Sequence, residues 1–385
     1  MTLDFDRAVD VYAQASDFTV GLEEEFALLD PVTLDLVPRF EELRDVAAAT
    51  DPTLHEHITG ELISSEIEII SGPGADVHDA FARQRDRRRR LFALAESRGV
   101  ALGACGTHPW ADYREQPIID TEHYRRVEEG LKYVAWRNNT FSLHVHVGVR
   151  DLDRAVKVCD RLRPVLPVLL ALSASSPYVD GRDSGLHSAR TQTFTRSFPR
   201  CGIPDAFGSW AAYREYLEFL VGTGSIIEFT QVWWSVRPHL AYGTVEVRIC
   251  DAQPTAGESE VLAGLIVACV AQAALDVDAG VPFDHPAPRL IEENVWRAIR
   301  HGMDGELIDL RRGDVVSAAE VVGRLGEWAA PARERLAIAL PDAVELNGAQ
   351  RQRRQIAAGA TSQEVYAGAV REALHSYGGQ AILPR

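Results

Sequence analysis

The stretch NTFSLHVHVGV, residues 139–149, decides the fold, because its polar and apolar residues alternate from Ser142 onward. In an extended chain successive side chains point to opposite faces. His144 and His146 therefore share one face with Ser142 and Gly148, and only leucine and valine occupy the other. A strand with one polar and one apolar face is typical of an antiparallel sheet, since buried parallel strands read as continuous apolar runs. This stretch predicts a strand of such a sheet, with an apolar face packed in the core and a polar face toward solvent.

Other segments before residue 256 repeat the pattern. We expect strands near 18–29, 62–71, 100–106, 140–149, 230–239 and 243–252. We expect helices near 76–98, 151–176 and 206–221. Several of these strands alternate strongly, and strands interleaved with helices around an antiparallel sheet predict an α+β fold.

The composition changes after about residue 280, where VPFDHPAP precedes a tail rich in alanine, arginine and glutamate. Segments around 288–302, 316–338 and 361–376 carry apolar residues at helical spacing. A chain of 385 residues exceeds the length at which one hydrophobic core usually stops growing, yet one large sheet can support it. We expect a single domain over 1–385, mixed α/β at about 17–280 and helical at about 281–385.

The charge balance restricts the partners. There are 56 acidic and 40 basic residues, a net charge of -16, which argues against nucleic acid or an anionic membrane surface. The N-terminus carries acids where a secretory signal would carry bases, and no apolar stretch reaches transmembrane length, so we expect a cytoplasmic protein. Reduced, mostly buried thiols are expected at Cys105, Cys159, Cys201, Cys250 and Cys269, which show no close pairing.

The basic run RQRDRRRR at 83–90 has two interpretations. Apolar residues such as Phe81, Leu91 and Phe92 flank it within one helical segment. A solvated helix face is the interpretation we favour, and a site for a polyanion is the alternative.

Carboxylates gather on two of the expected strands. In FTVGLEEEFALL, residues 18–29, strand periodicity places Glu23 and Glu25 on one face. In ITGELISSEIEIISGP, residues 58–73, Glu66 and Glu68 share a face, whereas Glu61 reaches it only if a turn or bulge intervenes. Like charges on one face repel each other, so these acids indicate a metal or arginines among them. The alternative is a solvated outer face.

The strand GTVEVRICD, residues 243–251, presents Glu246 beside Arg248. Alone this could be a cross-strand ion pair, just as the two histidines could be surface imidazoles. If all four strands pair in one sheet, however, their polar residues converge. A carboxylate-rich site with imidazoles suits magnesium or manganese, which also bind substrate phosphates.

The sequence contains no GxxxxGK[ST] motif, so metal ions and arginines would have to hold any phosphates. The stretch LHSARTQTFTRSFPRCG, residues 186–202, offers His187, Arg190, Arg196 and Arg200 and shows neither helical nor strand periodicity. It predicts an active-site loop, and an ordinary surface loop is the alternative.

Taken together, these segments resemble the glutamate-cysteine ligase type 2 family, carboxylate-amine ligases related at superfamily level to glutamine synthetase. The resemblance runs from about residue 17 to the C-terminal helices. It rests on GLEEEF (21–26), ELISSEIEIISGP (61–73), GTHPW (106–110), HVHVG (144–148), SARTQTFTRSFPRCGIP (188–204) and GTVEVRICD (243–251). It implies a curved antiparallel sheet with flanking helices, the catalytic fold of glutamine synthetase and the guanido kinases.

The resemblance also implies the site residues. Metal ligands are expected at Glu23, Glu25, Glu61, Glu68, Glu246 and either His144 or His146. Arg248 and Arg190 are expected to act on phosphate or substrate carboxylate, with Arg196 as a further nucleotide-binding residue. Loops within 178–206 are expected to shield the reactive intermediate from water.

The implied reaction uses ATP and Mg²⁺, with Mn²⁺ as an alternative metal, to form an acyl phosphate, γ-glutamyl phosphate in the family. An amine then displaces the phosphate, and weak activity with cysteine is expected. The substrates are small molecules, and a homodimer is expected only from the frequency of twofold oligomers. Two alternatives remain open: a metal-dependent hydrolase that needs no nucleotide, and a binding protein without turnover.

Overall fold

The computed structural model describes residues 4–341 and 346–378. The strands are β1 (Val20–Leu29), β2 (Ile58–Thr59), β3 (Glu66–Ile70), β4 (Ala101–Gly103), β5 (Ser142–Gly148), β6 (Tyr178–Val179), β7 (Arg182–Asp183), β8 (Cys201–Gly202), β9 (Trp233–Trp234), β10 (Val236–His239), β11 (Thr244–Asp251), β12 (Glu306–Ile308) and β13 (Val315–Ser317). The α-helices are α1 (Phe5–Gln14), α2 (Phe40–Thr50), α3 (Pro52–His55), α4 (Val77–Ser97), α5 (Glu122–Leu131), α6 (Tyr133–Trp136), α7 (Leu152–Leu162), α8 (Leu166–Ser173), α9 (Ala189–Ser197), α10 (Trp210–Gly222), α11 (Ala256–Asp278), α12 (Pro288–His301), α13 (Ala318–Trp328), α14 (Ala330–Arg335), α15 (Gly348–Ala357) and α16 (Ser362–Gly378).

The main sheet has the order β10-β11-β5-β1-β3-β2, and β4 also pairs with β1. Every pairing in it is antiparallel. The strand that carries HVHVG, β5, lies between β1 and β11, so the three strands richest in polar residues are neighbours. The α+β fold with an antiparallel sheet, predicted from the alternation, is confirmed.

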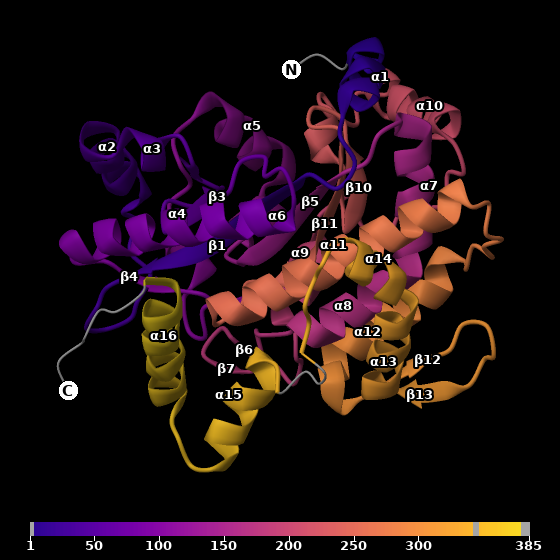
Figure 1. Ribbon diagram of the computed structural model, residues 1–385. Coiled ribbons are helices and arrows are strands. Elements are labelled where there is room, and N and C mark those ends of the chain that lie inside the picture. The colour runs from indigo at the N-terminus through magenta and orange to yellow at the C-terminus, as the bar shows by residue number, and fades with distance from the viewer. Residues whose placement is uncertain (1–3, 342–345, 379–385) are drawn as a thin grey trace.

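The apolar face of the sheet packs against helices from distant parts of the chain. On β5 the side chains of Leu143, Val145 and Val147 are buried in the main core, beneath α11, while α7 packs on β10 and β11. On β1 and β3, Phe26 and Ile67 belong to a second core beneath α4 and α16. Figure 1 shows α4 and α11 running across the sheet. The C-terminal helix α16 therefore packs with the sheet and with α4.

The helix α11 was not among the expected elements. The expectation that no apolar stretch reaches transmembrane length is wrong for α11, which is long and apolar enough to cross a membrane by length and composition, but 72% of its most apolar window is buried inside the fold. Apolar residues surround it on all sides because α7, α8, α14, α16 and the sheet all contact it. A helix that is hydrophobic all round is what a core position requires, and Cys269 on it is buried, as expected for a structural thiol.

Two expected elements differ from the structure. The helix expected at 151–176 is split into α7 and α8 by the 3-10 turn Arg163–Val165, because Pro164 and Pro167 each lack the amide hydrogen that a continuous helix needs. The prediction of a loop at 186–202 is wrong for its middle part, which forms the helix α9. Ser188 caps α9 by accepting a hydrogen bond from the Thr191 amide.

The basic run at 83–90 is not simply a solvated face. Arg88 is 1% exposed, and its Nε and Nη2 donate to Glu24 on β1, each at 2.7 Å. Glu24 points away from Glu23 and Glu25, toward α4, as strand periodicity requires. The interpretation as an exposed face is wrong for Arg88, which forms a buried bidentate ion pair instead.

Candidate active site

The polar face of the sheet is largely shielded from solvent, because most of its charged side chains are buried. Glu25 is 7% exposed, Glu68 5%, His144 4% and Glu246 1%. Residues of α5 and α9 and the segment at 229–234 line the space above them. The polar face is therefore the floor of an enclosed site.

Strand pairing sets the neighbours on this floor. Glu23 of β1 lies opposite His144 of β5, and Glu25 lies opposite Glu68 of β3. Side chains directly opposite each other on one face have Cβ atoms about 5 Å apart. The register alone thus brings two of the acid-bearing strands and the histidine strand together.

A turn before β3 brings Glu61 to the polar face of the sheet, beside Glu25 and Glu68. The strand β3 begins only at Glu66, and the residues at 62–65 leave the extended conformation. Glu61 could share the face of Glu68 only if a turn or bulge interrupted the strand. This turn does so, and it lets Glu61 face Glu25 and Glu68.

Among the described residues, ligand atoms lie within 4.8 Å of one another in three sets: Glu25, Glu61 and Glu68; Glu23, Glu68 and His144; and Glu23, His146 and Glu246. Glu23 and Glu68 each belong to two sets, so the sets form one continuous group, which we call the acid cluster. Carboxylate oxygens dominate it, and imidazole nitrogens occur only toward β5. Such a donor set fits hard divalent cations such as Mg²⁺ and Mn²⁺.

The electrostatics of the acid cluster favour added cations. Burial, followed by repulsion from Glu25, raises the pKa of Glu61 to about 8. The pKa of Glu68 is raised well above its usual range, first by burial and then by Glu23 and Glu61. The same happens to the pKa of Glu66, through burial and then Glu25. If all the carboxyl groups on this side were ionised, their negative charge would exceed what their basic neighbours balance, and divalent cations would supply the missing positive charge.

The other side of the acid cluster has basic partners. Burial opposes ionisation of Glu23, yet its pKa lies well below the usual range because His146 and His144 face it. Its oxygens lie 3.1 Å from His144 Nδ1 and 3.0 Å from His146 Nε2. His146 Nδ1 is bonded to Thr244 Oγ1 at 3.0 Å, which leaves Nε2 directed at Glu23 and Glu246. An imidazole held in this way by its second nitrogen is typical of metal ligands.

Three arginines come from β11 and the elements beside it: Arg248 from β11, Arg237 from β10 and Arg190 from α9. Glu246 is paired with Arg237 of β10, Nε to Oε2 at 2.6 Å, and with the guanidinium of Arg248. Although burial opposes it, these arginines hold the pKa of Glu246 well below its usual range. Arg190 of α9 donates to the carbonyl oxygens of Arg248 and Ile249, both at 3.2 Å. Arg190 and Arg248 also line the same cavity.

Arg196 lies elsewhere. It is on the last turn of α9, and its Nη1 is 3.1 Å from Glu292 of α12 in a partly exposed pair. The cavity lining includes Arg190, Phe194 and Phe198 from this segment but not Arg196. The structure thus brings together all the residues to which a role was assigned except Arg196. His187, which faces Asp304, and Arg200, which donates to the carbonyl oxygen of Gln231, also lie outside the lining of this cavity.

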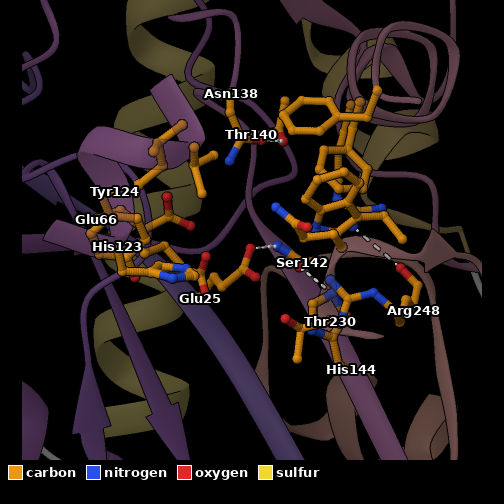
Figure 2. A pocket seen from close by; sticks show the side chains of 18 residues that line it. Glu25, Glu66, His123, Tyr124, Asn138, Thr140, Ser142, His144, Thr230 and Arg248 are labelled. Carbon is orange, nitrogen blue, oxygen red and sulfur yellow. Dashed lines mark hydrogen bonds between the residues drawn. The ribbon is translucent and has the colours of Figure 1, made fainter. Parts of the chain in front are cut away.

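Two cavities adjoin the acid cluster. One, of about 140 Å³, is lined by Glu25, Glu61, His144, Arg190 and Arg248, and we call it the β3–α9 cavity. Figure 2 shows Glu25, Glu66, His123 and Tyr124 on one side of it and Arg248 on the other.

The second cavity, of about 420 Å³, lies at the start of β1, and we call it the β1 cavity. Glu23 and His146 form its polar part, while Val20, Leu22 and Tyr242 are among its apolar walls. The volume of the β1 cavity is in the range of small-molecule sites, and the β3–α9 cavity is smaller.

Two site residues were missed from the sequence. Arg237 was inside an expected strand but was not singled out, although its alternation with Ser235 and His239 is the signal that places it on the polar face. Glu66 was noticed as a neighbour of Glu68 and not assigned a role. Its side chain is 1% exposed and lines the β3–α9 cavity.

Comparison with known proteins gives consistent matches. The sequence model of glutamate-cysteine ligase family 2 matches residues 19–376. A protein of Rubrobacter xylanophilus, provisionally named glutamate–cysteine ligase 2-2, is 39% identical over 83% of this chain and 82% of its own length. A protein of Sorangium cellulosum with the provisional name glutamate–cysteine ligase 2 is 38% identical over 88% and 87%.

Among solved structures, glutamate–cysteine ligase of Francisella tularensis in complex with AMP superposes with a TM-score of 0.66 at 12% identity, covering 95% of this chain and 91% of that one. A bifunctional glutathione synthetase of Pasteurella multocida gives a TM-score of 0.64 at 14% identity, covering 96% and 53%. At these identities the structures establish the shared fold, and the sequence matches establish the family. The chain belongs to glutamate-cysteine ligase family 2.

Proposed function

We propose that this protein is an ATP-dependent carboxylate–amine ligase, an activity that its membership of a ligase family supports. It would convert the side-chain carboxylate of an amino acid, glutamate in the first instance, into an acyl phosphate and join it to an amine. The observation that carries the proposal is the acid cluster, in which buried carboxylates outnumber the bases beside them. A reaction that brings a carboxylate to a triphosphate needs cations placed in advance, where negative charge accumulates.

Two cation sites follow from the sets of ligand atoms. Glu25, Glu61 and Glu68 would hold one Mg²⁺, and Glu23, His146 and Glu246 another. Bound there, Mg²⁺ would supply charge neutralisation and polarisation of phosphoryl oxygens. Of the two histidines we favour His146 as the metal ligand, because its Nδ1 is already hydrogen-bonded to Thr244 and its Nε2 faces two carboxylates. Mn²⁺ would fit the same donors.

The two cavities suggest where the substrates bind. The β1 cavity adjoins the set with His146 and has apolar and aromatic walls, so we place the nucleotide base there. The β3–α9 cavity adjoins the set with Glu61 and contains Arg190 and Arg248, so we place the amino acid there. A planar guanidinium can hold a carboxylate through two parallel hydrogen bonds. The AMP bound to the Francisella tularensis ligase fits the assignment of a nucleotide to this fold.

The reaction then proceeds in two steps. An oxygen of the substrate carboxylate bonds to the terminal phosphorus of ATP, and the bond from that phosphorus to the bridging oxygen breaks, so that ADP leaves with the electron pair. The amine nitrogen next bonds to the acyl carbon, and phosphate leaves with the electrons of the carbon–oxygen bond. Starting from an ammonium ion, one proton leaves with the phosphate and one passes to solvent. Arg248 would stabilise charge on the transferred group, and burial of the floor would keep water from the acyl phosphate.

We also propose that the described chain acts as one catalytic unit. Helix α16, near the C-terminus, packs against α4 and β4, and α11 and α12 contact α8 behind β11. The helical part after residue 280 would therefore support the sheet and would not form a separate domain.

ADP release from ATP and Mg²⁺, with glutamate and a panel of primary amines, tests the proposal. Hydroxylamine is added in a parallel assay because it traps an acyl phosphate as a coloured hydroxamate. Glu23→Gln, which removes a ligand from the proposed cation site with His146 and Glu246, should lower the rate by about 100-fold or more. Glu334→Gln is the matched control, since Glu334 is exposed on α14, which packs against α11.

Release of ADP without any trapped hydroxamate would contradict the acyl phosphate. Turnover of an ester or amide with zinc and without ATP would favour the hydrolase. The relatives and solved structures described above are named as ligases or synthetases, and they lend the hydrolase no support.

A further inference from the structure

Glu66 is a buried carboxylate with an unused oxygen. It is 1% exposed and lines the β3–α9 cavity. Its carboxyl group shares a side-chain hydrogen bond with Glu25, but its Oε2 has no hydrogen-bond partner among the described residues. Leaving a buried carboxylate oxygen without a partner is costly, so such an atom in a cavity indicates a ligand that supplies a donor.

The basic groups of the site lie away from Glu66. Arg248 is on the opposite side of the cavity (Figure 2) and is engaged with Glu246. His123 is on the same side as Glu66, but its nearest carboxylate is Glu228, with Nδ1 to Oε1 at 3.6 Å. Within the described ranges no ion pair reaches Glu66, and it is absent from the sets of close ligand atoms in the acid cluster.

The distance along β3 from Glu66 to the acid cluster matches the length of a small substrate. It precedes Glu68 by two residues on β3, and its cross-strand partner is Ala27, two residues beyond Glu25. Two residues of a strand span about 7 Å. A cationic group held by Glu66 would therefore lie within a few bonds of a carboxylate activated beside Glu25 and Glu68. Tyr124 and Val127 of α5 add aromatic and aliphatic walls to this side of the cavity.

We propose that Glu66 forms the binding subsite for the cationic nitrogen of the amine substrate, so that the second substrate is a small primary amine bound as its ammonium ion. This inference rests on the proposed ligase function and names the substrate class of the same site. Binding would replace the missing partner of Glu66 with a charge-assisted hydrogen bond. Arg190 and Arg248 on the opposite side would hold the amino acid, so the cavity would receive two substrates of opposite charge at its two sides.

The test uses the full-length protein with ATP, Mg²⁺, glutamate and hydroxylamine, and it measures hydroxamate formation near neutral pH. Hydroxylamine is mainly uncharged there, whereas methylamine, ethanolamine and cysteine carry an ammonium group. Each amine is added as a competitor, so its binding is measured whether or not it reacts. In Glu66→Gln the inhibition constants of these amines should rise about tenfold or more, the loss of one hydrogen bond to a charged group. The KM values for ATP and glutamate should change much less.

Glu66→Asp, which keeps the charge on a shorter side chain, should fall between wild type and Glu66→Gln, and it serves as the second variant should Glu66→Gln fail to fold. Glu61→Gln is the contrasting variant, because loss of a proposed metal ligand should lower hydroxamate formation itself.

Amines that do not inhibit the wild type, or that inhibit Glu66→Gln equally well, would overturn the subsite while leaving the ligase intact. A raised Mg²⁺ requirement in Glu66→Gln with unchanged amine constants would overturn it in favour of a metal ligand. Absence of hydroxamate from the wild type would overturn the proposed function as well.

Discussion

The two faces of the sheet both bury charge, but they balance it differently. On the apolar face Glu24 meets Arg88 in a bidentate pair, with Gln84 and Ser259 completing its hydrogen bonds. Burial opposes ionisation of Glu24, and Arg88 still lowers its pKa. On the polar face the neighbouring residue Glu25 lies among other carboxylates. Adjacent residues of one strand thus occupy opposite electrostatic environments.

This difference separates structural charge from functional charge. A fully paired buried ion contributes to the packing of α4 on β1, and its removal should affect stability. A surplus of buried carboxylates weakens the metal-free fold and persists where a cation or substrate compensates for it. The exposed fraction of a side chain does not distinguish the two cases, whereas its charge balance does.

The largest expected effect is on stability. Arg88→Met leaves Glu24 buried without its cation and should lower the free energy of unfolding by about 3–5 kcal/mol. Thermal and urea unfolding measure it. In the double variant Glu24→Leu/Arg88→Met most of this loss should be recovered, because neither charge remains to be desolvated. If the double variant is as unstable as the single one, packing and not charge pairing explains the effect.

On the polar face, removal of one buried charged group should lower activity and not stability. Glu68→Gln removes one carboxylate from the crowded part of the acid cluster, so kcat/KM for ATP-dependent hydroxamate formation should fall by about 100-fold. The melting temperature of the metal-free protein should stay the same or rise, since repulsion from Glu23 and Glu61 is relieved. Steady-state kinetics and calorimetry on one preparation test both parts, and a melting temperature that drops as far as in Arg88→Met would contradict the comparison.

Magnesium should stabilise the wild type through the acid cluster. At a Mg²⁺ concentration 100 times its dissociation constant, the free energy of unfolding should rise by about 2.7 kcal/mol. Because burial and Glu25 raise the pKa of Glu61 to about 8, the metal-free folded protein holds a proton there that the unfolded chain has lost. Stability of the metal-free protein should thus fall as the pH rises toward 8, while stabilisation by Mg²⁺ should grow. Melting temperatures with EDTA or Mg²⁺ across this range check the sign, and Glu68→Gln should lose the metal-dependent gain.

The smallest effect is expected at Arg196. Its pair with Glu292 is partly exposed, so Arg196→Ala should cost less than about 1 kcal/mol of stability and change the KM for ATP by less than about twofold. Arg248→Ala, tested alongside, should reduce kcat strongly. A large rise in the KM for ATP in Arg196→Ala would show that α9 moves toward the nucleotide during turnover.

Much of the site was predictable because its residues lie on regular strands. Period-two alternation assigns Glu23, Glu25, His144, His146, Glu246 and Arg248 to polar faces without any knowledge of the partner strand. The α9 segment was harder, because its first turn buries Ala189, Arg190 and Thr191 and shows no apolar stripe. Arg88 could not be distinguished from the other arginines for a similar reason, since six arginines between 83 and 90 obscure the buried positions.

The sequence by itself determined which side chains share a strand face, because alternation along an extended chain is a local property. It also determined the family, through motifs spread over most of the chain. Only the tertiary structure decided the strand order, the burial of the polar face, the turn that carries Glu61 to Glu25 and the separation of paired from unpaired charge. These depend on which distant segments meet, and the energy of a buried charge depends on all the groups around it.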